Sequence, residues 1–176
     1  MGKNKYLLLL LILISTVTQL TKAQTVPTDF TFKYTFGFGL KKTHDHKTNY
    51  DEKKNILTVY GIDTVMKFSL KLTPAEKQKI YEKLLTINFA LYPEKYSYQH
   101  PDTVEAFISA PCQQYSLTVI TESKAKSVDW NNCIDGSTKD LKYEALKELD
   151  RVIQKIIWAY NPLKDYHPTK MEFDPE

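Results

Sequence analysis

The chain has 176 residues, a length typical of a single domain. Hydrophobic residues make up 42% of it and charged residues 26%, a globular composition that excludes a largely disordered chain. The formal net charge is +3, but Lys3, Lys5 and Lys22 all lie in the first 23 residues, so the rest of the chain is neutral. Because nucleic-acid-binding proteins carry a basic excess, we expect no nucleic-acid partner.

The N-terminal segment predicts export. Basic residues at Lys3 and Lys5 precede an apolar run over residues 6–14, and small and polar residues then lead to Ala23. This order is typical of a cleaved signal peptide, and the run is shorter than the about 20 apolar residues of a transmembrane helix. We therefore expect a signal peptide over residues 1–23, cleavage near Ala23, a secreted or periplasmic location and no stable membrane anchor afterwards. An uncleaved anchor is the alternative.

The remaining chain is predicted to be one α+β domain over residues 24–162, followed by a flexible, proline-rich tail over 163–176. Five aromatic residues and then Leu40 occupy every second position over 29–40, which is typical of a half-buried strand. The polar stretch 41–55 has no period and is predicted to be a loop. Shorter strands are predicted over 55–60 and 65–72, joined by a turn.

A helix is predicted to begin after Thr73. This residue can cap the first backbone amides, Pro74 suits the first helical position, and Glu76 completes a capping box. Apolar residues recur at helical spacing as far as Leu91, and Pro93 is expected to end the helix. Residues 92–111 hold three prolines and are predicted to form a long loop, with a short strand around 104–108 as the alternative.

A hairpin is predicted around residues 122–123. The register that places Tyr115 opposite Trp130 also places Cys112 opposite Cys133. A shift of two residues would keep the same faces and leave the cysteines close. Since an exported chain with two cysteines normally oxidises them, we predict a Cys112–Cys133 disulfide, with a free reactive cysteine as the alternative.

The last predicted element is an amphipathic helix over residues 139–160, capped by Ser137 or Thr138. The order is then three strands, a helix, two strands and a helix. This order predicts a mostly antiparallel sheet of about five strands with two amphipathic helices packed on one face.

Two histidines in the predicted loop 41–55 are candidate metal ligands. His44 and His46 are separated by one residue, with Asp51 and Glu52 close by. Zinc normally takes three or four protein ligands, and no further ligand can be assigned from spacing; a solvated loop is the alternative. We predict no cofactor. We also assign no catalytic residue, because no serine lies in a Gly-x-Ser-x-Gly motif.

Three tyrosines, Tyr92, Tyr96 and Tyr98, cluster in the predicted loop 92–111. Tyrosine is favoured at recognition surfaces because its ring is amphipathic and fairly rigid. The cluster is therefore a candidate binding surface. The alternative is that these rings cover an edge of the sheet.

Three short motifs resemble a group of small exported bacterial proteins. They are Phe36-Gly37-Phe38-Gly39, then Leu72-Thr73-Pro74-Ala75-Glu76 with Ile80-Tyr81, and Ile87-Asn88-Phe89 with Tyr92-Pro93. In that group an aromatic strand with a Gly-rich step precedes a helix and a Tyr-Pro turn. The resemblance implies an exported bacterial α+β protein; the group has no established function, so the resemblance implies no catalytic residue.

These observations favour a non-enzymatic binding or interaction module, with a protein partner in the cell envelope or outside the cell. One alternative is a small secreted hydrolase that uses carboxylates or a metal bound in the loop of His44 and His46. Another is a structural or stress-related exported protein with no specific ligand.

Overall fold

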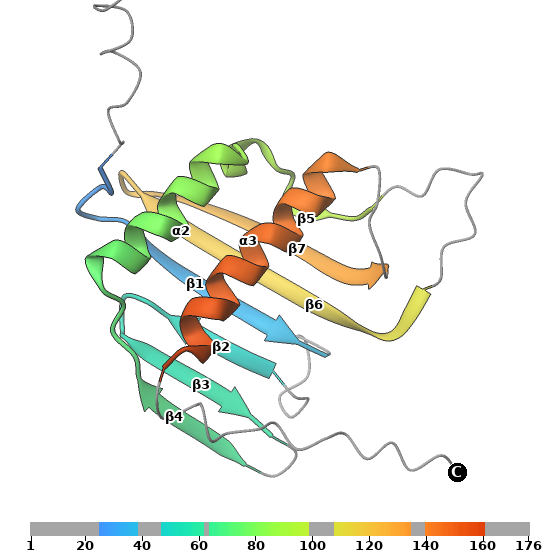
Figure 1. Ribbon diagram of the computed structural model, residues 1–176, viewed down its shortest axis with the longest axis horizontal. Helices are drawn as coiled ribbons and strands as arrows, with labels where there is room; N and C mark the ends of the chain where they lie inside the picture. The colour runs from blue at the N-terminus through green and yellow to red at the C-terminus, as the bar shows by residue number, and fades with distance from the viewer. Residues whose placement is uncertain (1–24, 39–46, 62–63, 99–107, 135–139, 161–176) are drawn as a thin grey trace, which may run out of the picture.

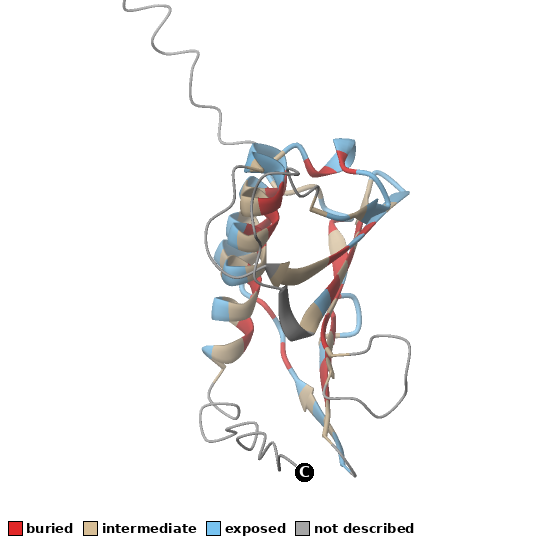
Figure 2. Ribbon diagram, turned by 90° about the vertical axis from the view of Figure 1, so that its right-hand side faces the viewer, coloured by how far each residue is buried: buried red, intermediate tan, exposed pale blue. Residues whose placement is uncertain are grey.

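The computed structural model describes residues 25–38, 47–61, 64–98, 108–134 and 140–160. The elements are β1 (Thr31–Gly37), β2 (Lys47–Asp51), β3 (Ile56–Tyr60), β4 (Val65–Ser69), α2 (Pro74–Thr86), the 3₁₀ helix η1 (Phe89–Leu91), β5 (Lys95–Tyr96), β6 (Ile108–Thr121), β7 (Lys124–Ile134) and α3 (Leu141–Trp158). They form one seven-stranded sheet in the order β4-β3-β2-β1-β6-β7-β5. Both helices pack on one face of it (Figures 1 and 2).

The predicted α+β class is confirmed, but the sheet is larger than expected and it is mixed. Strand β2 lies inside the predicted loop 41–55, and β5 pairs in parallel with β7. Strand β2 has only Thr48 and Tyr50 as alternating inward residues, too weak a pattern to predict a strand. It forms because β1 and β3 pair with its two edges. Strand β5 has two residues, too few for any period.

Helix α2 is shorter than predicted. It ends at Thr86, because Asn88 adopts a left-handed conformation with φ 53° and ψ 49° that no α-helix continues through. The chain then forms η1, and Leu91 becomes exposed instead of extending the buried stripe. Helix α3 lies within its predicted range but is capped by Asp140; the expected caps, Ser137 and Thr138, lie outside the described residues.

The aromatic alternation of β1 builds the core. Phe32, Tyr34 and Phe36 point to the helices and are at most 7% exposed. The ring centroid of Phe30, just before β1, lies 5.2 Å from that of Tyr81 on α2. Each such side chain stabilises the fold by about 1.5–3 kcal/mol when it is fully buried.

The predicted hairpin register is confirmed. Tyr115 pairs with Trp130, and the turn residues Glu122 and Ser123 have φ of 49° and 59°, as a tight two-residue hairpin turn requires. A disulfide joins Cys112 to Cys133 near the other end of the hairpin, with 4.6 Å between their Cα atoms. The predicted pairing of the cysteines is therefore present in the fold.

No helix among the described residues is both long and apolar enough to cross a membrane. The predicted signal peptide over 1–23 and the predicted tail over 163–176 lie outside the described residues.

Candidate functional site

A groove of about 670 Å³ lies where α2 begins. Three chain segments line it: residues 26–31 around the start of β1, residues 52–55 of the turn between β2 and β3, and residues 71–78 at the start of α2. Its volume falls within the range of about 300–1,000 Å³ that is usual for small-ligand sites.

Backbone hydrogen bonds hold the three walls together. The Glu52 amide donates to Phe32 O at 3.0 Å, which ties the turn to β1. Asn55, with φ 53°, closes the turn, and its carbonyl accepts the Leu70 amide at 2.9 Å. Residues ahead of α2 are thereby fixed beside the turn.

The start of α2 matches the sequence prediction. The Thr73 amide donates to Glu76 Oε2 at 2.8 Å, and the Glu76 amide donates to Thr73 Oγ1 at 3.3 Å. This capping box satisfies two backbone donors and sets the direction in which α2 leaves the groove.

Glu52 is the unusual residue of the groove. It is only 7% exposed, and the Lys77 Nζ lies 2.7 Å from its Oε1. Its Oε2 is also buried and has no hydrogen-bond partner among the described residues. A buried acceptor normally has a partner, and leaving one unpaired costs about 1–3 kcal/mol.

The remaining charge of the groove is positive. Lys53 and Lys71 line it, both are exposed, and neither makes an ion pair among the residues that the structure describes. The neighbouring Asp51 is taken up by other lysines, with Lys33 Nζ at 3.4 Å. The predicted metal ligands His44 and His46 lie outside the described residues. Within those residues, no three His, Cys, Asp or Glu side chains are placed to hold a metal ion.

The three candidate tyrosines pack within the fold. Tyr92 is 4% exposed and donates its hydroxyl to Lys142 O at 3.0 Å, so it does not lie on the surface. The half-buried Tyr96 donates to Asp140, whose Oδ2 lies 2.6 Å away, and the Tyr98 ring lies 5.4 Å from that of Tyr143. Burial and this hydrogen bond raise the pKa of Tyr96. A partner at Tyr96 and Tyr98 stays a prediction.

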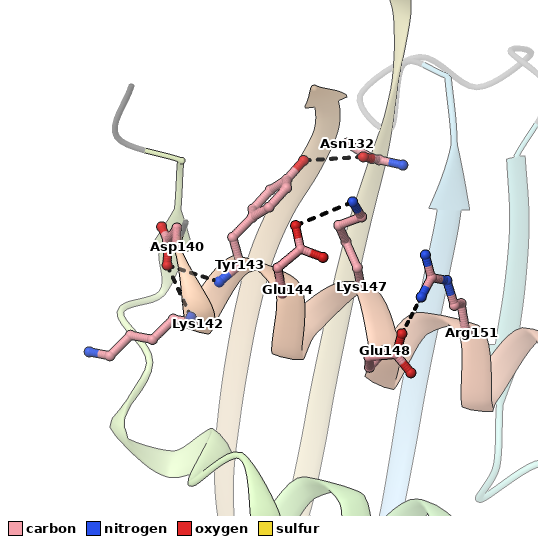
Figure 3. Close-up of polar contacts among 8 residues, drawn as sticks. All are labelled: Asn132, Asp140, Lys142, Tyr143, Glu144, Lys147, Glu148 and Arg151. Carbon is pink, nitrogen blue, oxygen red and sulfur yellow. Dashed lines mark hydrogen bonds and ion pairs between the residues drawn. The ribbon is translucent and has the colours of Figure 1, made fainter. Parts of the chain in front are cut away.

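Hydrogen bonds around Asp140 and Tyr143 hold the start of α3 in place (Figure 3). Asp140 Oδ1 accepts the amides of Lys142 and Tyr143 at 3.0 and 3.1 Å, and the Tyr143 hydroxyl donates to Asn132 Oδ1 at 3.2 Å. The Tyr96 hydroxyl bonds the same Asp140 carboxylate. The tyrosines thus fix β5 and the first turn of α3 to the sheet.

An apolar notch lies beside this region. It has a volume of about 280 Å³ and is lined by Leu91 of η1, Leu141 of α3 and neighbouring residues. Leu91 is 78% exposed and Leu141 is 83% exposed. The sequence does not predict that these two leucines are exposed, because the helical spacing predicts Leu91 on the buried stripe of a longer helix.

A buried polar cluster lies under α3 and was also not predicted. The Tyr34 hydroxyl donates to Asp150 Oδ1, and Gln154 Nε2 donates to the same oxygen at 2.7 Å. Burial raises the pKa of Asp150, and these hydrogen bonds and the charge of Arg151 only partly oppose the effect. Burial also raises the pKa of the Tyr34 hydroxyl, and the Asp150 carboxylate adds to this shift. The cluster joins α3 to the central strand.

Replacement of Asp150 by asparagine is expected to gain stability relative to the natural protein as the pH rises. The favourable contribution of the protonated carboxyl is complete below its unfolded pKa of about 3.9 and is lost as the pH rises through the raised folded value. Asparagine does not ionise and can still accept the Tyr34 hydroxyl. Urea unfolding at pH values from below about 3.9 upward measures the free energy of unfolding of the variant and of the natural protein. Replacement of the exposed Asp129 by asparagine is the matched control. A stability difference that stays constant or shrinks as the pH rises would contradict the raised pKa of Asp150.

The face of the sheet opposite the helices is mostly polar. Asn49 Nδ2 donates to Thr35 Oγ1 at 2.7 Å, and the hydroxyls of Thr118 and Ser127 lie 2.8 Å apart. These contacts follow from the polar half of each alternating strand. The described part of this face therefore favours a solvated surface over an apolar docking surface.

In comparisons with known proteins, no family model and no curated protein matches this chain.

Proposed function

We propose that this chain is a non-enzymatic binding module that works outside the cytoplasm and takes its ligand in the groove at the start of α2. The observation that supports this proposal is Glu52, a buried carboxylate that lines a groove of about 670 Å³ and has one oxygen without a hydrogen-bond partner in the described part of the chain. Binding sites keep polar groups of this kind because the ligand completes their hydrogen bonding.

Export is part of the proposal. The N-terminal segment has the order of a signal peptide ending near Ala23, and the Cys112–Cys133 bridge suits a secreted or periplasmic location, where disulfides persist. The exposed pair Leu91 and Leu141 favours, in addition, contact with a protein partner in the envelope or outside the cell. The hydrolase alternative, which would use carboxylates or a metal bound by His44 and His46, stays a prediction, since both histidines lie outside the described residues.

A ligand screen by nuclear magnetic resonance tests the proposal. Charged, hydroxylated and apolar small compounds are added to the ¹⁵N-labelled secreted protein. We expect at least one class to shift the amide signals of Asn55, Lys71 and Lys77 without being converted. Thr28→Trp, which places a large ring at the groove, is expected to abolish these shifts while the rest of the spectrum stays folded.

Two results would contradict the proposal. One is the absence of any shift at the groove with every compound class. The other is turnover of a bound compound, which would indicate an enzyme.

A further inference from the structure

We infer that the groove at the start of α2 takes a hydroxylated anion: a sugar-like ring that carries a carboxylate or a phosphate group. This inference rests on the proposed function and names the ligand class for the same groove.

The charges of the groove favour an anion. Glu52 is balanced by Lys77, whose Nζ lies 2.7 Å from Oε1. Lys53 and Lys71 also line the groove, and within the described residues neither is neutralised by a carboxylate. Glu76, in the first turn of α2, offsets the partial positive charge of the helix N-terminus, so the two lysines supply the attraction. An acidic group seated between the two exposed lysines therefore meets an attractive field.

The unpartnered oxygen of Glu52 favours a hydroxyl on the same ligand. A carboxylate oxygen can only accept, so the missing partner must be a donor. An ammonium donor would meet repulsion from the lysines that line the groove, whereas a hydroxyl is neutral. Glu52 Oε2 is itself buried, so the hydroxyl reaches it once the partly exposed Lys77 side chain shifts toward the anion.

The walls suit a ring of this kind. Pro27 and Pro74 line the groove and offer rigid apolar surfaces, against which the C–H face of a sugar ring can pack. A volume of about 670 Å³ leaves room for one or two rings. The combined requirement is therefore an anionic group, hydroxyls and a compact ring.

A titration followed by nuclear magnetic resonance tests each requirement separately. The probes are galacturonate and glucose 1-phosphate, their neutral counterparts galactose and glucose, and the plain ions acetate and inorganic phosphate. At millimolar concentrations we expect galacturonate or glucose 1-phosphate to shift the amides of Asn55, Lys71 and Lys77. The better of the two identifies the anionic group as a carboxylate or a phosphate.

Three variants locate the binding. Lys71→Gln is expected to weaken it about two- to fivefold, the change that one exposed charge pair produces. Glu52→Met, which has no side-chain oxygen to accept a hydroxyl, is expected to remove the preference for the sugar acid over the plain ion. Lys142→Gln, an exposed lysine at the start of α3, is the matched control and should leave binding unchanged.

Several outcomes would overturn the inference. Equal binding of the neutral sugars removes the anion requirement, and equal binding of acetate or phosphate shows an adventitious ion only. If no probe binds while another compound class shifts the groove signals, this inference fails and the proposed function stands. If no compound of any class shifts them, both fail.

Discussion

Phe32→Ala is expected to lower the free energy of unfolding by about 3–5 kcal/mol, the largest single effect in this protein. Phe32 lies on the central strand β1 and is 1% exposed. Its ring lies 5.9 Å from that of Phe30 and 5.6 Å from that of Tyr50, so truncation leaves a cavity where three aromatic rings meet. Urea unfolding followed by circular dichroism measures the loss.

Two further variants of β1 keep this test interpretable. Phe32→Leu retains most of the volume, so it should fold and lose clearly less stability than the alanine variant. Lys33→Ala removes an exposed neighbour and should change stability by at most about 1 kcal/mol. A loss at Phe32 no larger than that at Lys33 would show that β1 is not the centre of the core.

Replacement of Cys112 and Cys133 together by serine is expected to cost about 3 kcal/mol. The bridge spans a sequence separation of 21 residues, and closing a loop of that size removes about this much chain entropy from the unfolded state. It lies where the pairing of β6 with β7 shifts register between Ile108 and Gln113, so the ladder there is irregular. We therefore expect the pairing beyond Gln113 to weaken first.

Urea unfolding measures the stability of the double variant. Reduction of the disulfide in the natural protein should reproduce the loss. Mass spectrometry of the protein expressed with its N-terminal segment, before and after reduction, checks whether the bridge forms and whether the predicted cleavage leaves a chain that begins at Gln24. Free thiols in the purified protein, or an unchanged stability without the bridge, would contradict the expected role of the disulfide in the hairpin.

Local sequence patterns predicted the parts of the fold that depend on near neighbours. The aromatic alternation of β1, the capping box at Thr73 and the Tyr115–Trp130 register all follow from short-range spacing. Strands β2 and β5 could not be found in this way, because partners distant in sequence create them. Leu91 was misplaced because only the backbone conformation of Asn88 ends α2 early.

The candidate site was less predictable for the same reason. The sequence indicates Glu52 only as an acidic neighbour of His44 and His46. Its ion-pair partner in the fold is Lys77, which comes from α2. Asp150 interrupts the apolar stripe of α3, and this could have indicated a buried polar contact. Its partner Tyr34, however, lies 116 residues away. Tertiary packing decides which polar residues of this chain meet.

Whether the proposed groove at the start of α2 binds a ligand can be seen in a crystal structure of the protein with the best compound from the ligand screen. We expect that compound between Glu52 and Lys71, with a donor within hydrogen-bonding distance of Glu52 Oε2. A compound bound elsewhere, with Glu52 Oε2 still unpartnered in an empty groove, would contradict it.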